Sequence, residues 1–191
     1  MKIACIGWGS LIWDTSREFI IDGDWQTNGP ILPIEFARQS NSGNITLVIE
    51  EKAKLVQTLW AKMTDDNIPS AMARLRIREG TGSDFIHYQR NNSLAKTPIQ
   101  QIILQWMEPH ELDAVIWTGL PSKFNGENGQ TPTLDELKAY FKNLKNTDIK
   151  TFEKAKEYIL NTPKQVETNY RPHLEELFTR QEPSDSELEK K

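Results

Sequence analysis

Four short apolar segments follow one another in the first third of the chain, and they constrain its fold more than any other feature. They cover residues 2–7, 31–38, 44–50 and 55–62, and an irregular, turn-rich segment lies at 14–29. The loop QSNSG between the second and third segments has the length and the glycine typical of a hairpin. Short strands at close spacing predict an antiparallel or mixed sheet, which can curl into a small barrel.

A helix is expected next, because residues 68–79 are bounded by start and stop signals. Asn67 can cap the first turn, Pro69 suits that turn, and Gly80 can end the helix. Strand character then returns in two further apolar segments, 98–107 and 114–120.

The last third of the chain is predicted to be helical. Thr133 and Glu136 form a capping box at the start of one helix, and helices are expected over 133–145, 150–161 and 170–180. Aromatic residues in these helices, Tyr158 among them, are interpreted as packing. The sequence thus predicts an α+β fold: a mixed or antiparallel small β-barrel with flanking helices over 1–120, a helical extension packed on it over 121–181, and a disordered polar tail over 182–191.

Composition and charge exclude several classes of protein. The 191 residues carry a net charge of −4 and no basic tract, so no nucleic-acid partner is expected. The single cysteine, Cys5, lies in the first apolar segment and is expected to be a small buried hydrophobe. We see neither a signal-peptide pattern nor an uncharged apolar run long enough to span a membrane, so we expect a cytoplasmic protein without a membrane partner. The oligomeric state stays open.

Glu79 interrupts the apolar stripe of its own helix. Ile68, Met72 and Leu75 recur at helical spacing, and the next position on that face is this glutamate. Burial and the negative end of the helix dipole would both raise its pKa toward the range of a general base. The alternative is an ordinary ion pair with Arg76, one turn back, and the spacing alone does not decide between the two.

The loop that follows the first strand contains two glycines and a serine. Backbone N–H groups around Gly7 and Gly9 can form a small nest for a carboxylate or an oxyanion, to which Ser10 could add its hydroxyl. The alternative is a simple turn at the end of the strand, with Trp8 and Trp13 as core or rim aromatics. A phosphate-binding loop is disfavoured, because neither G-K-[ST] nor G-x-G-x-x-G is present.

Other polar residues carry weaker signals. The histidines lie far apart and lack the i,i+4 spacing of a helical metal pair, so no metal is expected. Arg38 can be interpreted as a partner for a substrate carboxylate or, in line with the general pattern, as a cation at the end of a strand.

The loop and the glutamate together resemble the gamma-glutamylcyclotransferase-like superfamily. Short motifs of that superfamily occur in the same order over residues 1–120: WGSL (8–11), GP-x-LP (29–33) leading to Phe36, Val48-Ile49, V-x-x-L-W (56–60) and RE-G (78–80). One departure is plain, since Trp8 stands where the family usually has tyrosine.

The resemblance implies a reaction. Glu79 would be the catalytic acid/base, and the substrate-binding residues would be Trp8, Gly9, Ser10, Leu11 and Tyr88, with Phe85 as an alternative to Tyr88. A gamma-glutamyl amide would cyclise to 5-oxoproline and release an amine or amino acid, without any cofactor. Two alternatives stay open: a non-catalytic binding module on the same fold, and an amide hydrolase. The leaving group is equally open, from glutathione to simple gamma-glutamyl amines.

Overall fold

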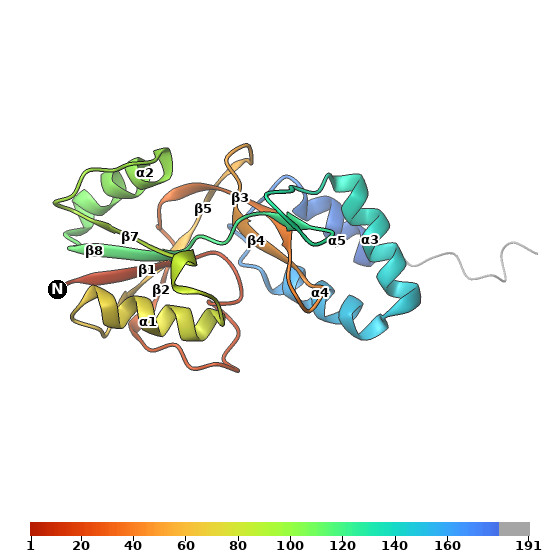
Figure 1. The fold of residues 1–191 in the computed structure, drawn as a ribbon, viewed down its shortest axis with the longest axis horizontal. Coiled ribbons are helices and arrows are strands. Elements are labelled where there is room, and N and C mark those ends of the chain that lie inside the picture. Colours follow the sequence, from red (N-terminus) through yellow and green to blue (C-terminus); the bar gives the residue numbers. More distant parts are fainter. Residues whose placement is uncertain (180–191) are drawn as a thin grey trace, which may run out of the picture.

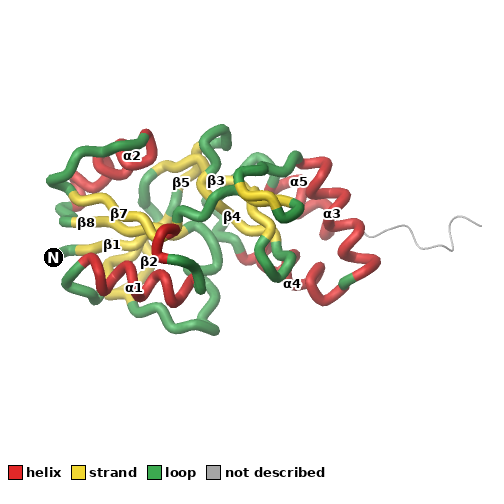
Figure 2. The backbone as a smooth tube through the Cα atoms, in the orientation of Figure 1, coloured by secondary structure: helices red, strands yellow, loops and turns green. Residues whose placement is uncertain are grey.

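The computed structural model describes residues 1–179, and they form an α+β fold with two lobes (Figure 1). In one lobe the helices α1 and α2 lie on either side of a sheet; in the other the C-terminal helices pack around β3 and β4 (Figures 1 and 2). The tail expected over 182–191 lies outside the described residues.

The elements have the following bounds. The strands are β1 (Ile3–Gly7), β2 (Ile21–Gln26), β3 (Ile31–Gln39), β4 (Ile45–Ile49), β5 (Leu55–Gln57), β6 (Leu59–Met63), β7 (Ile86–Arg90), β8 (Ala114–Thr118), β9 (Lys123–Phe124) and β10 (Glu127–Asn128). The α-helices are α1 (Ile68–Glu79), α2 (Pro98–Met107), α3 (Leu134–Thr147), α4 (Ile149–Asn161) and α5 (Arg171–Thr179), and 3-10 turns occur at Ser83–Phe85 and Glu108–His110.

The strands form two mixed sheets. The first has the order β2-β6-β1-β8-β7, in which β1 runs parallel to β8 and antiparallel to β6. The second has the order β10-β9-β3-β4, and β5 also pairs with β3. One sheet curls into a half-barrel, but within residues 1–179 the structure does not show the closed small barrel expected from the sequence.

The prediction of a strand over 98–107 was wrong. This segment is helix α2, which begins after Thr97, whose side chain accepts a hydrogen bond from the Gln100 backbone N–H, and has Pro98 in its first turn. Its apolar residues place Ile103 and Met107, four apart, in the core. Two smaller predictions also need correction: the irregular segment 14–29 contains β2, and the segment 55–62 is divided between β5 and β6.

The predicted helix boundaries that rest on capping are confirmed. The Asn67 side chain accepts a hydrogen bond from the Ser70 backbone N–H, and Gly80 takes the left-handed conformation, with φ of 61°, that ends α1. Thr133 and Glu136 form both hydrogen bonds of the capping box at α3. These signals are local, so the sequence is sufficient to predict them.

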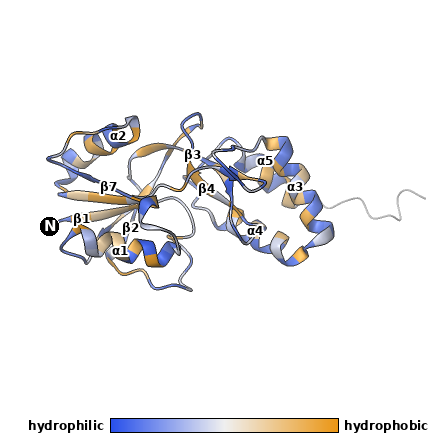
Figure 3. Ribbon diagram, in the orientation of Figure 1, coloured by the Kyte–Doolittle hydropathy of each residue, from blue (hydrophilic) through white to orange (hydrophobic). Residues whose placement is uncertain are grey.

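The core connects the N-terminal strands with the C-terminal helices. Hydrophobic residues concentrate on the strands between α1 and α2 (Figure 3). A second cluster joins Trp8 and Phe36 to Phe141, Phe152 and Ile159 of α3 and α4. The helices beyond residue 120 therefore pack directly against the strand–loop junction where the expected site lies. Cys5 is fully buried, and burial raises the pKa of its thiol.

Candidate active site

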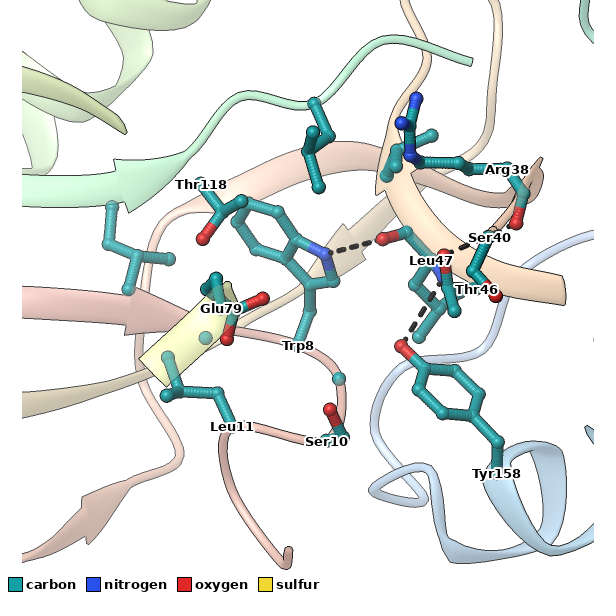
Figure 4. A pocket seen from close by; sticks show the side chains of 15 residues that line it. Trp8, Ser10, Leu11, Arg38, Ser40, Thr46, Leu47, Glu79, Thr118 and Tyr158 are labelled. Atoms are coloured by element: carbon teal, nitrogen blue, oxygen red, sulfur yellow. Dashed lines mark hydrogen bonds between the residues drawn. The ribbon is translucent and has the colours of Figure 1, made fainter. Parts of the chain in front are cut away.

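A cavity of about 190 Å³ lies where β1 ends, and it contains most of the residues singled out in the sequence (Figure 4). Its lining residues are Ile6, Gly7, Trp8, Gly9, Ser10, Leu11, Arg38, Ser40, Thr46, Leu47, Val48, Glu79, Thr118, Leu120 and Tyr158. The loop after β1 and the last residue of α1 thus meet, although about 70 residues separate them in the chain.

Tyr88 does not lie in this cavity, contrary to expectation. Its side chain is 45% exposed, and it lines a separate cavity of about 560 Å³ together with His87 and Trp117. Phe85, the alternative, does not line the first cavity either. The resemblance implies an aromatic residue soon after Glu79, but neither Phe85 of the 3-10 turn nor Tyr88 of β7 lines the cavity that contains Glu79.

Glu79 is the acidic residue of the cavity. It ends α1 on the same face as Ile68 and Leu75, as the helical spacing predicts, and its side chain is 21% exposed. Its Oε1 atom is buried and has no hydrogen-bond partner among residues 1–179. Burial raises the pKa of Glu79; the positive charges of Arg78 and Arg17 oppose this rise, and the negative charge of Asp14 adds to it.

The ionic partner of Glu79 is Arg78 and not Arg76. The Arg78 side chain is only 4% exposed, and its Nη1 lies 3.9 Å from Glu79 Oε1, whereas Arg76 is exposed on the outer face of α1. The Nη2 of Arg78 donates hydrogen bonds to the carbonyl oxygens of Ser10 and Asp14, both at 3.0 Å. Sequence reasoning missed this role, because nothing in a turn with three arginines indicates which one points inward.

The two glycines of the loop are required because a larger residue would clash with neighbouring side chains. Neither has a positive φ, but a Cβ on Gly9 would stand 2.5 Å from the Tyr158 hydroxyl, and a Cβ on Gly7 would stand 2.9 Å from the Trp25 ring. Trp8 forms a wall of the cavity, since its indole Nε1 donates a hydrogen bond of 3.2 Å to the Leu47 carbonyl oxygen (Figure 4). Trp8 is at the same time buried in the core cluster, so it lines the cavity and packs in the core, and its expected role in substrate binding stays a prediction.

Tyr158 comes from α4, outside the region of resemblance. Its hydroxyl oxygen accepts a hydrogen bond of 3.4 Å from the Leu47 backbone N–H and also faces the backbone N–H of Ser10. Burial raises the pKa of Tyr158, so the phenol stays protonated at neutral pH. Its O–H proton has no acceptor in the described part of the chain, which leaves it free to donate into the cavity. No sequence signal distinguished Tyr158 from the packing aromatics around it.

A wider and more open cavity of about 910 Å³ adjoins the first and shares Ser10, Glu79 and Tyr158 with it. Glu79 therefore lies at the junction of a narrower cavity and a wider one that is more open to solvent. A carboxylate at such a boundary can exchange protons with a bound molecule while its burial keeps the pKa raised.

Residues 1–179 contain no group of three or more His, Cys, Asp or Glu side chains that could hold a metal ion. Within the same residues no helix has the length and apolar character needed to cross a bilayer. No family model matches the sequence, and neither the curated proteins nor the solved structures contain a match.

Proposed function

We propose that this chain is a gamma-glutamylcyclotransferase-type enzyme, which cyclises a gamma-glutamyl amide to 5-oxoproline and releases an amine or amino acid. Glu79 carries the proposal. Its carboxylate has a raised pKa and a buried oxygen that finds no hydrogen-bond partner among the described residues, and it faces the same cavity as the glycine loop. A carboxylate in this state is suited to proton transfer, and the resemblance assigns that role to the same residue.

The reaction needs only proton transfers and one exchange of an acyl bond. Glu79 takes a proton from the alpha-ammonium of the substrate, and the free amine attacks the side-chain amide carbonyl of the same molecule. The new C–N bond closes a five-membered ring, and the old amide C–N bond breaks. Glu79 passes protons from the attacking nitrogen to the leaving nitrogen and ends in its starting state. Because both reacting groups belong to one molecule, orientation supplies much of the rate.

The developing oxyanion needs hydrogen-bond donors, and the loop and α4 offer them. The Tyr158 hydroxyl and the Ser10 backbone N–H lie beside each other at the cavity. In this proposal the Tyr158 hydroxyl oxygen keeps the hydrogen bond from the Leu47 backbone N–H, and its O–H donates a hydrogen bond to the carbonyl oxygen of the substrate. The activity uses no cofactor, and we place it in the cytoplasm.

The test is a panel of gamma-glutamyl amides incubated with the purified chain, with 5-oxoproline measured by mass spectrometry. We expect Glu79→Gln to lower kcat by about 10²–10⁴-fold, the range typical of a lost general base. Glu157→Gln is the matched control, because Glu157 is an exposed acid that lines only the wider cavity; this variant should keep full activity.

Three other outcomes would contradict the proposal, and each has its own pattern of products. Equal activity of wild type and Glu79→Gln would show that Glu79 is not the base. Free glutamate in place of 5-oxoproline would identify an amide hydrolase. Binding of the amides without any product, detected as a thermal shift, would identify a binding module.

A further inference from the structure

The cavity of about 560 Å³ that contains His87 lies apart from the cavity of Glu79. It is found where α2 begins, β7 begins and β8 ends, and these elements lie side by side in one lobe (Figure 1). Glu79 does not line it, and among the described residues the two cavities share only Leu120. Its volume falls within the range of small-molecule sites, which is roughly 300–1,000 Å³.

The His87 ring is seated in this cavity by a glycine. A Cβ on Gly119 would stand 2.5 Å from the Cε1 atom of His87 and 2.6 Å from its Nδ1. The φ of Gly119 is not positive, so the conformation of the backbone does not require a glycine there, whereas the close approach of the ring does. Trp117 packs against the same ring with centroids 5.8 Å apart.

Packing alone therefore fixes the imidazole of His87. Within residues 1–179 neither of its ring nitrogens has a hydrogen-bond partner. An imidazole has at least one N–H donor, and the other nitrogen accepts or donates according to its protonation. The seat on Gly119 thus holds the ring in one orientation and keeps both nitrogens available to a bound molecule.

The start of α2 adds two further groups that can only donate. The Lys96 backbone N–H donates a hydrogen bond of 2.9 Å to the Gln100 Oε1, which leaves the amide N–H groups of Gln100 for another partner. The Lys96 ammonium likewise has no partner among residues 1–179. Glu51 is the single acid among the described residues that line the cavity. Donors therefore exceed acceptors around it.

The rest of the lining is largely apolar. It includes the side chains of Ile49, Ile86, Ile99, Trp117, Leu120 and Pro121. Apolar surface of this kind favours a ligand with a hydrocarbon or aromatic body, because burying both surfaces removes them from water. An excess of donors at the same place favours a carboxylate on that body, since hydrogen bonds to ionised acceptors are the stronger ones.

We propose that this second cavity binds a small organic acid with an apolar body, and that Lys96, Gln100 and His87 hold its carboxylate. The inference is independent of the proposed function, because the site contains neither Glu79 nor the glycine loop. It stands whichever reaction the first cavity performs.

The experiment uses three probes that share an indole ring and differ in charge: indole-3-acetate, indole and tryptamine. Isothermal titration calorimetry on the purified chain measures their affinities. We expect indole-3-acetate to bind in a 1:1 ratio and more tightly than the other two, by about 10-fold or more. Lys96→Met should weaken its binding by about 10-fold and leave indole unchanged.

Further variants locate the probe. His87→Phe keeps a ring and loses the nitrogens, so indole-3-acetate should bind about 3–10-fold more weakly. Lys142→Met is the matched control for Lys96→Met, because Lys142 is an exposed lysine of α3 that lines neither cavity. Arg38→Met is the control for the first cavity, where Arg38 could attract an anion. Both controls should bind indole-3-acetate like wild type.

Several results would overturn the inference. Lack of binding by all three probes at millimolar concentration would show that the cavity is not a site for this class of ligand. Tightest binding of tryptamine would mean that Glu51 sets the preference and that the ligand is a cation. A loss in Arg38→Met but not in Lys96→Met would place the probe in the first cavity, and equal losses in Lys96→Met and Lys142→Met would show unspecific attraction by charge. Displacement of the probe by a gamma-glutamyl amide would make the cavity part of the first site.

Discussion

Arg78 and Glu79 are adjacent in the chain, and both side chains point inward at the end of α1, with Nη1 of the first 3.9 Å from Oε1 of the second. The same guanidinium holds the carbonyl oxygens of Ser10 and Asp14. One buried cation thus fixes the loop beside the carboxylate and limits the rise in the pKa of Glu79. Burial still outweighs this effect, so the pKa of Glu79 stays raised.

The pH dependence of activity should follow from this raised pKa. A general base acts only when deprotonated, so kcat/KM should rise with pH as Glu79 loses its proton. The midpoint should lie above the ordinary glutamate pKa of 4.5. A pH–rate profile measured with a substrate that does not titrate in this range checks the prediction. A midpoint at or below 4.5 would contradict it.

The raised pKa of Glu79 should also make the stability of the chain depend on pH, with the contribution of Glu79 to the free energy of unfolding larger at low pH than at neutral pH. The folded state binds the Glu79 proton more tightly than the unfolded state, so its contribution to the free energy of unfolding is present at low pH. That contribution is lost as the pH rises through the raised pKa. Glu79→Gln mimics the protonated form. At pH 7 its Tm should exceed that of wild type, by about 2–4 °C for each kcal/mol gained, and the difference should shrink below pH 4.

The two neighbouring arginines provide a matched pair of variants. Arg78→Met removes the hydrogen bonds to Ser10 and Asp14, and it should lower the free energy of unfolding by about 2–4 kcal/mol. It should also move the acid limb of the pH–rate profile upward, because a positive charge next to Glu79 is lost. Arg76→Met, on the exposed face of the same turn, should change stability by no more than about 0.5 kcal/mol. Chemical denaturation measures the free energy of unfolding of both variants. Equal losses in the two variants would contradict the role of Arg78 in holding the loop.

The close approach of Gly9 and Tyr158 can be tested by a double-mutant cycle. Gly9→Ala should destabilise the chain by about 1–3 kcal/mol, because the new Cβ would stand 2.5 Å from the Tyr158 hydroxyl. In the Tyr158→Phe background the nearest ring atom is Cζ, at 3.6 Å, so the same substitution should cost much less. Strictly additive effects in thermal denaturation would mean that the two residues do not contact each other.

The activity of Tyr158→Phe tests its role as a hydrogen-bond donor. The variant keeps the ring and loses the hydroxyl, so we expect kcat to fall by about 10–100-fold with little change in KM. Tyr140→Phe is the control, since the Tyr140 hydroxyl donates to the Gly43 carbonyl oxygen and does not line the cavity. A rise in KM alone would indicate that Tyr158 only shapes the cavity.

The sequence by itself determined those features that depend on near neighbours in the chain. Asn67, Gly80 and the Thr133–Glu136 pair set helix ends through hydrogen bonds that span a few residues. The helical period likewise placed Glu79 on the buried face of α1. Segment 98–107 shows the limit of such local patterns, because a short apolar run suits a buried strand or a helix, and only the cap at Thr97 distinguishes the two.

Only the tertiary structure decided the rest of the site. It brought Tyr158 of α4 over Gly9, turned Arg78 inward in place of Arg76, placed Arg38 at the cavity, and kept Tyr88 away. These outcomes depend on how a helix and a sheet pack against each other across large distances in the chain. No local spacing encodes that packing, because the side chains involved are neighbours only after the core has formed.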